Sequence, residues 1–410
     1  MKKAFQFRIY PNKNQEVILN RTLSTCRHLY NDSLSERKKQ AELNKLKKEF
    51  DVFPWGKTEW INKYDQMLDL TATKTTYQKE VFSQVLQDVI KRVDKSFKNF
   101  FNGFGYPRFK GRNSYNSFTY PQMGFSIEDG KLNLSKIGNI KIIQHREIEG
   151  KIKICTIKKD IDQWYVTFSC DIETHITPVE IKTKTGIDVG LSSLITMSNG
   201  EQIEPPEFLR ESDDKLTHEQ KRLSRKKKGS GKRNKQKIIV AKVHRKIRNQ
   251  RKDFAHKTSR KLVDTYDYIV FEDLQIKNMV QNHRLAKSIS DAGWYQLQAF
   301  TTYKAEWAGK QSEFVVPNGT SQECCICGNK ETMTLADRVF RCSKCGNIKD
   351  RDHNAAINIE SRSTAGTAGI NARQGLLDRG SMQRDAQSPS GFGQFTEIHV
   401  IENNFDVGDP

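Results

Sequence analysis

Hydrophobic and polar residues follow two different periods over the first hundred positions of the chain. Residues 4–10 (AFQFRIY) alternate apolar and polar side chains, which predicts a half-buried strand that stops at Pro11. Apolar side chains then recur at helical spacing over residues 14–46 and 77–101, with a looser stretch around Pro54 between them. These patterns predict one strand followed by a helical block.

The pattern changes to short alternating segments over residues 117–173. Examples are KIKIC at residues 151–155 and WYVTF at residues 164–168, and turn sequences such as EDG at residues 128–130 separate them. Several strands of this length predict a small antiparallel β-barrel, and the N-terminal strand is a candidate further member. The helical block is then expected to be an insertion into the barrel.

A different domain is expected after residues 174–184, which form a linker with mixed charge. Residues 187–191 (IDVGL) and 268–274 (YIVFEDL) each carry acidic residues within apolar runs typical of buried strands. From about residue 361 the chain is rich in Gly, Ser, Ala and Gln and has no sustained period. We therefore expect a mostly disordered tail.

Positive charge is concentrated in one segment of the chain. The 410 residues carry a net charge of +20, and residues 215–261 hold 20 Lys or Arg residues against two acids, a net charge of +18. A uniformly solubilising charge would be spread more evenly, although a solvated pair of basic helices remains an alternative. Release of counterions from phosphates makes nucleic acid the favoured partner.

Other partners and compartments are less compatible with the sequence. No apolar run approaches the roughly 20 residues that span a bilayer, and the N-terminus lacks the apolar stretch of a signal peptide. We therefore expect a protein that stays in the cytoplasm and does not bind membranes. Eight cysteines in a reducing compartment indicate metal ligation or burial, not disulfides.

Four of the cysteines have the spacing of a zinc site. Cys324 and Cys327 form one C-x2-C pair, Cys342 and Cys345 form another, and each pair is followed directly by glycine. Two such turns complete a closed tetrahedral shell, so we expect one structural Zn²⁺. The alternative is that the two C-x2-C pairs are redox motifs, but the surrounding sequence lacks the thioredoxin-like context that this interpretation requires. We interpret Cys325 as a residue that takes no part in the zinc site. The other three cysteines are interpreted as core residues: Cys26, Cys155 and Cys170.

Three acidic residues are candidates for a catalytic metal site. Asp188 and Glu272 lie in apolar strand-like runs, where an uncompensated charge is costly. Asp352 follows the cysteine motif at the start of a helix-like segment. Carboxylates that converge can hold two Mg²⁺ ions about 3.5–4 Å apart for phosphodiester cleavage.

Each of these acids has an alternative. A carboxylate at the end of a strand is often a cap or an ion-pair partner. Asp273 and Asp350 are adjacent competitors. Alternation along a strand directs Glu272 and Asp273 to opposite faces, so only one of the two can point into a site. Spacing alone does not choose between Asp350 and Asp352.

Six segments, in order, resemble the TnpB family, the transposon-encoded RNA-guided nucleases ancestral to type V CRISPR effectors. The resemblance covers nearly the whole chain. The segments are residues 186–191 (GIDVGL), 223–226 (LSRK), 249–257 (NQRKDFAHK), 271–274 (FEDL), 320–324 (TSQEC) and 345–356 (CGNIKDRDHNAA). The resemblance implies that Asp188, Glu272 and Asp352 are the catalytic acids of a RuvC nuclease with an RNase H-like fold.

The resemblance also implies partners and an architecture. The partners are a transposon-derived guide RNA and double-stranded target DNA with a short adjacent motif, bound by what we expect to be a monomeric ribonucleoprotein. The implied fold is multidomain α+β. Its parts are a β-barrel wedge domain (residues 1–13 and 105–182), an inserted helical recognition lobe (14–104), an α/β RuvC domain (183–319 and 346–362), a zinc-binding target nucleic-acid-binding insert (320–345) and a mostly disordered tail (363–410).

Nucleic-acid contacts are expected in three places. Polar residues of the helix that starts near Tyr77 are candidates for contacts to the duplex motif, and the aromatic and basic loop after it suits RNA. The basic segment supplies further candidates. Solvated helix residues and a structural loop remain alternatives for the first two sets. In order, the three sets are Lys79, Gln84 and Gln87; Tyr106, Arg108, Phe109, Lys110 and Arg112; and Arg225, Lys226, Lys227, Arg251 and Lys252.

Three other functions compete with an RNA-guided endonuclease. A DDE transposase shares the RNase H-like fold, but its acids run Asp, Asp, Glu along the chain, whereas here the order is Asp, Glu, Asp. A nuclease-dead RNA-guided repressor would normally have lost one or more of the three acids. A compact CRISPR-associated effector differs in its genomic locus, which the sequence does not contain.

Overall fold

The computed structural model describes residues 1–50, 59–173, 176–334 and 337–363. The predicted loop around Pro54 and the tail beyond residue 363, which was predicted to be mostly disordered, lie outside these ranges. The described chain divides into two compact units, residues 1–173 and residues 176–363. Mixed helix and sheet in more than one unit confirms the coarse fold class that the sequence predicted.

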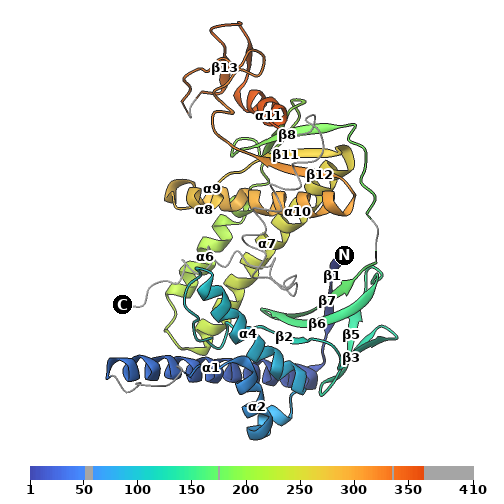
Figure 1. Cartoon of the computed structure of the whole chain (residues 1–410), viewed down its shortest axis with the longest axis vertical. Helices are drawn as coiled ribbons and strands as arrows, with labels where there is room; N and C mark the ends of the chain where they lie inside the picture. Colours follow the sequence, from blue (N-terminus) through green and yellow to red (C-terminus); the bar gives the residue numbers. More distant parts are fainter. Residues whose placement is uncertain (51–58, 174–175, 335–336, 364–410) are drawn as a thin grey trace. The chain divides into compact units, whose positions relative to one another are not determined.

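The first unit is built on one antiparallel sheet of seven strands in the order β2-β6-β7-β1-β5-β4-β3. The N-terminal strand β1 lies near its centre, where it pairs with β7 on one side and β5 on the other. The strands are β1 (Lys2–Tyr10), β2 (Ser117–Tyr120), β3 (Phe125–Glu128), β4 (Lys131–Leu134), β5 (Gly138–Ile143), β6 (Lys151–Asp160) and β7 (Gln163–Asp171). Figure 1 shows the sheet strongly curled.

Alternation along β1 produces the core of this unit. Phe5, Phe7 and Ile9 are buried while their neighbours are more exposed, as the sequence pattern predicted. Phe5 pairs in register with Phe168 of β7, which is also fully buried. The N-terminal strand is therefore an integral part of this sheet.

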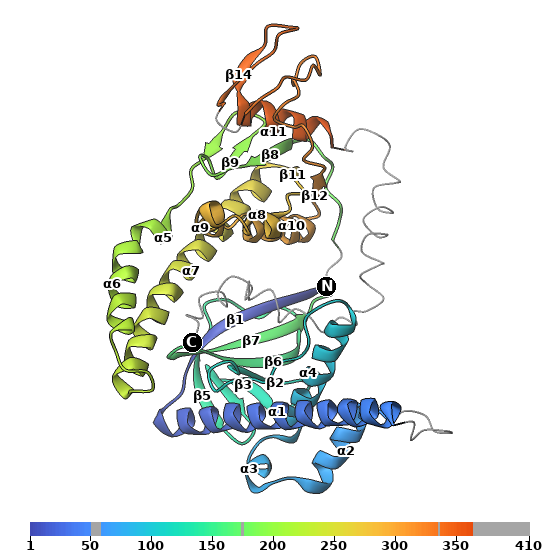
Figure 2. The same ribbon diagram turned by 90° about the vertical axis from the view of Figure 1, so that its left-hand side faces the viewer.

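Helices cover the sheet of the first unit (Figure 2). The predicted helix over residues 14–46 is confirmed as α1 (Lys13–Glu49), which begins at a capping box made by Asn12 and Gln15. A short helix that the sequence pattern did not indicate, α2 (Lys63–Thr73), follows. Helix α4 (Ser83–Phe101) packs against α1, and its Val85, Val89 and Val93 are buried in the core of the first unit.

The continuous helix predicted over residues 77–101 is wrong. The structure has a single turn, α3 (Thr76–Lys79), then a break, and only then α4. Thr75 and Gln78 form a capping box on the short turn, and the ring of Phe82 stacks on Tyr120 at 5.7 Å. Packing of Phe82 against the sheet therefore interrupts a pattern that has helical period on both sides.

The second unit contains a five-stranded sheet in the order β10-β9-β8-β11-β12. Strands β8, β11 and β12 run parallel, whereas β9 runs antiparallel to both of its neighbours. The strands are β8 (Lys184–Val189), β9 (Ile195–Met197), β10 (Gln202–Ile203), β11 (Tyr268–Glu272) and β12 (Gln311–Val315), with a separate hairpin of β13 (Val339–Arg341) and β14 (Ile348–Asp350).

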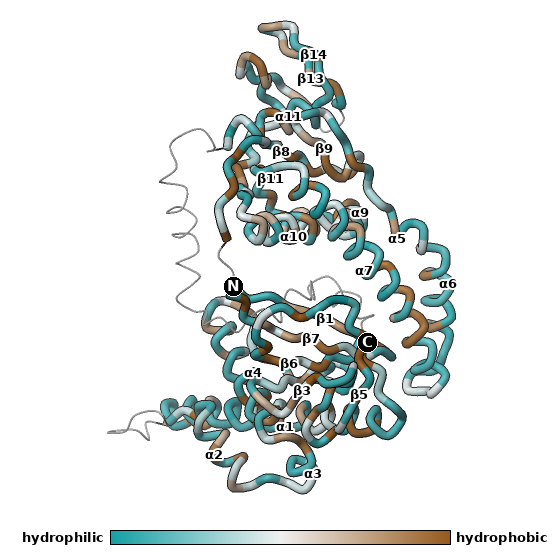
Figure 3. The backbone as a smooth tube through the Cα atoms, turned by 90° about the vertical axis from the view of Figure 1, so that its right-hand side faces the viewer, coloured by the Kyte–Doolittle hydropathy of each residue, from teal (hydrophilic) through white to brown (hydrophobic). Residues whose placement is uncertain are grey.

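Two helices carry most of the basic segment, and others complete the unit. Helix α6 (Asp213–Ser224) packs along α7 (Gly231–Thr265) through Leu216, Val243 and Ile247. Figure 3 shows mostly hydrophilic colour along both helices. The remaining helices are α5 (Phe208–Glu211), α8 (Ile276–Met279), α9 (His283–Ala292), α10 (Trp294–Trp307) and α11 (Arg351–Ser361).

The two faces of the five-stranded sheet are covered by different helices. Ile269 and Phe271 of β11 pack with residues of α7 and α10. Tyr268 and Val270, which point the other way, pack with Ile359 of α11. Because side chains alternate along a strand, Glu272 shares the face of Tyr268 and Val270, and therefore the face that α11 covers.

Helix α11 lies unusually close to β8. A Cβ atom on Gly186 would lie 2.2 Å from the carbonyl oxygen of Ala356 and 2.4 Å from the backbone nitrogen of Glu360. Any side chain at Gly186 would therefore collide with the helix backbone, which cannot move independently of the helix. The absence of a side chain at this position sets the distance between the helix and the strand.

We predict that Gly186→Ala lowers the stability of the second unit. Overpacking of this kind typically costs about 1–3 kcal/mol, which corresponds to roughly 2–4 °C per kcal/mol in a domain of this size. Thermal unfolding followed by circular dichroism measures the effect. Gly105→Ala is the matched control, because no atom lies within 4 Å of the position of its Cβ. Equal melting temperatures for the two variants would contradict the prediction.

Candidate metal centres

Asp188 and Glu272 are brought together by the parallel pairing of β8 with β11. Phe271 pairs with Ile187 in register, so Glu272 and Asp188 are the next residues along the two strands. Ile187 and Val189 pack in the core of α7 and α10, which directs Asp188 to the opposite face, toward α11. Both carboxylates thus share the face that α11 covers.

Glu272 is buried at the end of β11. Its side chain is only 6% exposed, and its Oε1 accepts a hydrogen bond from the hydroxyl of Thr320. The backbone carbonyl of Glu272 accepts a bond from Gln298 Nε2 on α10, at 3.4 Å. Asp273, by contrast, is exposed. The structure therefore separates these adjacent acids as alternation predicted.

Asp352 lies in the first turn of α11, whereas Asp350 is the N-cap residue of that helix. The Asp350 side chain caps the helix, with Oδ1 accepting from the backbone N–H groups of Asp352 at 3.0 Å and His353 at 2.9 Å. Asp352 Oδ1 accepts from the Arg351 guanidinium at 2.9–3.0 Å. Its Oδ2 lies 4.0 Å from the position that a Cβ of Gly190 would occupy, at the end of β8.

The carboxylates of Glu272 and Asp352 lie close enough to Asp188 to affect its ionisation. Burial raises the pKa of Asp188 well above its usual range, and the carboxylates of Glu272 and Asp352 raise it further. Arg351 acts in the opposite direction on this pKa. Burial also raises the pKa of Glu272, although the hydrogen bond from Thr320 opposes the shift. The site is thus short of positive charge.

This donor set fits divalent cations such as Mg²⁺. Carboxylate oxygens are the ligands that Mg²⁺ prefers, and a bound cation would relieve the repulsion that raises the pKa of Asp188. Among the described residues, however, the cysteines are the only group of metal-ligating side chains already gathered around one point. The three acids are close enough to interact but are spaced more widely.

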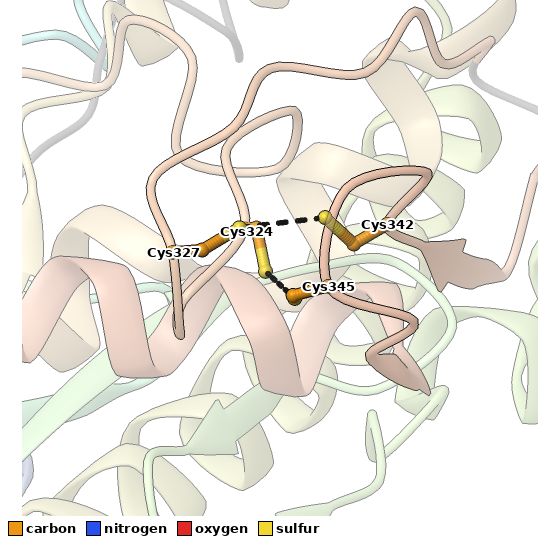
Figure 4. Close-up of side chains that lie close together, drawn as sticks. All are labelled: Cys324, Cys327, Cys342 and Cys345. Atoms are coloured by element: carbon orange, nitrogen blue, oxygen red, sulfur yellow. Dashed lines mark hydrogen bonds between the residues drawn. The ribbon is translucent and has the colours of Figure 1, made fainter.

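The four predicted cysteines form that second centre (Figure 4). Their sulfur atoms all lie within 4.8 Å of one another. The Sγ atoms of Cys324 and Cys345 are 3.6 Å apart, and those of Cys327 and Cys342 are 3.5 Å apart. Tetrahedral coordination with Zn–S near ~2.3 Å requires sulfur atoms about 3.8 Å apart. The cluster therefore fits one zinc ion.

The local backbone favours the thiolate form of Cys324 and Cys342, whereas at Cys345 the bond from the Asn347 backbone N–H is outweighed by burial and the neighbouring thiols, which raise the pKa of Cys345 to about 12. Burial opposes ionisation of Cys324, but backbone N–H groups of Cys327 and Ile326 donate to its sulfur, and the net effect lowers the pKa of Cys324 to about 6. The backbone N–H of Cys345 likewise lowers the pKa of Cys342. Deprotonated thiols are the form that binds zinc. Cys325 is half-buried beside the cluster, and Cys26, Cys155 and Cys170 are buried elsewhere, as predicted.

The residues predicted to contact duplex DNA do not share one helix. Lys79 is exposed on α3, whereas Gln84 and Gln87 are half-buried on α4. The break at residues 80–82 separates them, which corrects the expectation of a single helix. The three side chains remain candidates only.

The aromatic and basic loop forms a stacking surface with α1. Tyr106 and Phe109 are 43% and 52% exposed, and Lys38 Nζ lies 5.0 Å and 4.6 Å from their ring centroids. Arg108 and Arg112 are exposed. Lys110 is anchored, since its backbone N–H donates to Asn31 at 2.8 Å. Sequence inspection missed Lys38, which nothing in its helical segment distinguishes from its neighbours.

The candidate residues of the basic segment lie in two places: Arg225, Lys226 and Lys227 are in the connection between α6 and α7, and Arg251 and Lys252 are on α7. Arg225 and Lys227 are exposed, Lys226 Nζ donates to Gln236 at 2.6 Å, and Lys252 is half-buried. Arg251 pairs with Asp291 at 2.7 Å and is partly buried. Its guanidinium therefore holds α7 against α9.

The structure also assigns contacts to residues whose roles the sequence did not indicate. Thr320 and Asn358 lie within or beside segments that the family resemblance had marked, but no chemistry was assigned to them. Thr320 bonds Glu272, and Asn358 bonds the Thr320 carbonyl at 2.8 Å. These contacts join residues 38 or more positions apart, so no local pattern could reveal them.

Comparison with known proteins places the chain in a family. Residues 167–283 match a family described as a probable transposase, and residues 294–359 match a Cas12f1-like TNB domain. Two relatives are named "Putative RNA-guided DNA endonuclease". The one from Streptomyces pristinaespiralis is 34% identical, covering 90% of this chain and 91% of its own. The other, InsQ from Escherichia coli (strain K12), is 32% identical, covering 87% and 91%. The chain belongs to the TnpB family.

A more distant member and one domain match add detail to the TnpB assignment. A TnpB-like protein, L79, from Acanthamoeba polyphaga mimivirus is 26% identical over 50% of this chain and 42% of its own. Residues 1–45 match a family described as a helix-turn-helix domain. In this TnpB-family chain those residues form the strand β1 and most of the single helix α1.

We predict that Cys342→Ser lowers the zinc content of the purified protein from one ion per chain and destabilises the second unit, because the tetrahedral shell loses a ligand. Metal analysis by mass spectrometry measures the zinc. Cys325→Ser, which changes the neighbour of the cluster, should retain its zinc. Full zinc content in Cys342→Ser would refute the four-cysteine site.

We predict that Asp188→Asn stabilises the chain when divalent ions are absent. The pKa of Asp188 is higher in the folded than in the unfolded chain, so stability is lost as the pH rises above the ordinary value of about 3.9. At pH 7 the asparagine variant avoids this loss, worth about 1.4 kcal/mol per unit of pKa shift. Melting temperatures in EDTA should therefore rise by a few degrees. Asp273→Asn, at an exposed position, should change little, and a lower melting temperature for Asp188→Asn would contradict the prediction.

Proposed function

We propose that the chain is an RNA-guided DNA endonuclease that cleaves target DNA with Asp188, Glu272 and Asp352. The observation that carries this proposal is the convergence of three acids, from β8, β11 and α11, on one face of the sheet. Relatives of nearly the same length that are named RNA-guided DNA endonucleases support the substrate class. The chain order of the acids, Asp, Glu, Asp, supports a RuvC site over a DDE transposase.

The topology of the second unit supports an RNase H-like nuclease domain. Its central parallel strands carry the two strand-borne acids, and the antiparallel β9 extends the sheet beside β8. On this proposal the four-cysteine unit is the zinc-binding insert, the curled sheet of the first unit is the wedge barrel, and α1–α4 belong to the recognition lobe. The guide RNA would come from the transposon, and the protein would read a short motif beside the target.

The three carboxylates would hold two Mg²⁺ ions, which when bound supply an activated water and stabilise the leaving oxygen. Arg351 keeps Asp352 oriented through its bond to Oδ1, and Asp350 fixes the first turn of the helix. The basic segment would bind phosphates through exposed side chains such as Arg225 and Lys227, which lie in the connection between α6 and α7. Base pairing with the guide would select the sequence to be cut.

The described helices include none that is both long enough and apolar enough to cross a lipid bilayer. We propose a cytoplasmic ribonucleoprotein that acts on DNA in the nucleoid. A repressor with a dead nuclease site is disfavoured, because all three acids are present and the carboxylates of Glu272 and Asp352 are close enough to raise the pKa of Asp188.

We predict that Asp188→Ala, Glu272→Ala and Asp352→Ala each abolish target cleavage while guided DNA binding remains. Each change removes a ligand of the metal site and leaves the nucleic-acid surfaces intact. Purification of the chain with its RNA, sequencing of that RNA, and cleavage of a matched plasmid in Mg²⁺ make the test. Asp273→Ala is the control, since it removes the exposed acid next to Glu272 and should cut normally.

Three outcomes would contradict this function. Robust cutting by Asp188→Ala would refute the assignment of the three acids as the catalytic site. Guided binding without any cleavage by the wild-type chain would establish a repressor. Joining of transposon ends by the purified protein without RNA would establish a transposase.

A further inference from the structure

Thr320 is the polar side chain that meets Glu272 inside the second unit. Thr320 is 4% exposed and Glu272 is 6% exposed, so their hydrogen bond is shielded from water. The carbonyl of Pro317 is also near the Thr320 hydroxyl, at 3.2 Å, but the carboxylate oxygen is the closer acceptor. A bond from a hydroxyl to a buried carboxylate is among the stronger hydrogen bonds in proteins.

Two asparagines of α11 hold the segment that carries Thr320. Asn358 Nδ2 donates to the carbonyl of Thr320 at 2.8 Å and to that of Glu323 at 2.6 Å. Asn354, which is fully buried, donates to the Glu323 carbonyl at 2.7 Å and accepts from the backbone N–H of Cys325 at 3.0 Å. The segment that leads into the cysteine cluster is therefore fixed to the helix that carries Asp352.

The C-terminal end of α11 closes the same network. Arg362 Nη2 pairs with Glu323 Oε2 at 2.6 Å, and its Nη1 donates to the carbonyls of Val316 at 3.1 Å and Asn318 at 2.8 Å. Residues on both sides of Thr320 are thus bonded to one helix. The backbone that carries Thr320 is therefore held from both ends of α11, close to Glu272.

We propose that Thr320 is a positioning residue for the nuclease metal site, and that the segment between β12 and the zinc cluster holds Glu272 in the orientation that divalent ions require. This inference rests on the proposed function, because it assigns Glu272 to that metal site. The hydroxyl fixes one carboxylate oxygen of Glu272, so a cation meets a ligand that is already oriented. Hydrogen-bond partners of metal ligands typically change metal affinity or activity by about 10–100-fold when they are removed.

The substitution Thr320→Val tests this role, because it keeps the shape of the side chain and removes the hydroxyl. The full-length chain without nucleic acid is titrated with Mn²⁺, and the free ion is measured by electron paramagnetic resonance. Mn²⁺ is the probe because it accepts the same carboxylate ligands as Mg²⁺. We expect Thr320→Val to weaken binding about 10–100-fold, and Thr320→Ser to restore most of the affinity.

A second measurement distinguishes positioning from loss of structure. With guide RNA and target DNA, Thr320→Val should need about tenfold more Mg²⁺ for half-maximal cleavage and should recover rate at high Mg²⁺, with unchanged zinc content. Thr301→Val is the matched control. Thr301 is fully buried and its hydroxyl bonds the Leu297 carbonyl at 2.9 Å within α10, so its loss should leave the Mn²⁺ affinity unchanged.

The outcomes separate this inference from the proposed function. If Asp188→Ala abolishes Mn²⁺ binding while Thr320→Val binds and cuts like the wild type, the positioning role is overturned and the nuclease site stands. If Asp188→Ala leaves Mn²⁺ binding unchanged, the carboxylate site itself is overturned, and the role of Thr320 with it. If Mn²⁺ binding follows our expectation but no RNA-guided cutting occurs, the positioning role stands and the proposed function fails.

Discussion

The backbone of α11 lies directly on β8 at Gly186, and the second unit depends on this contact. Any larger residue at Gly186 would meet the carbonyl of Ala356 and the backbone nitrogen of Glu360. The close approach puts the first turn of α11 at the end of β8, where Asp352 faces Asp188. Residues 164 positions apart thereby enter one electrostatic environment. Capping by Asp350 then fixes the first turn of α11, and the ion pair with Arg351 fixes the orientation of the Asp352 carboxylate.

That environment is unfavourable to folding unless cations are present. Burial of Asp188 and Glu272 raises the pKa of both, and the shared negative charge adds to the effect on Asp188. A chain selected for stability alone would not keep ionisable groups in this arrangement, whereas a divalent cation turns the same arrangement into a binding site. The cysteine cluster is different, because its backbone N–H groups already favour the thiolate form of Cys324 and Cys342 around one point.

Local patterns succeeded where burial repeats with a short period. Alternation along β1 predicted its buried face, and the C-x2-C spacing predicted the cysteine cluster, because a tight turn brings both thiolates to one side. The prediction of a continuous helix over residues 77–101 was wrong at Phe82, where the helix is interrupted. The ring of Phe82 packs on Tyr120 of strand β2 at the break between α3 and α4, a contact that the period of the local sequence does not contain. The role of Thr320 was invisible for the same reason, since its partner lies 48 positions away.

The sequence by itself determined the family, the cysteine ligands and the identity of the candidate acids, because motif order and spacing are local properties. It left Asp350 and Asp352 equivalent until the family resemblance separated them. Tertiary structure decided that Asp350 is a helix cap and that Glu272, not Asp273, is buried. It also decided which helix covers which face of the sheet, since parallel pairing and helix packing join residues that no period along the chain relates.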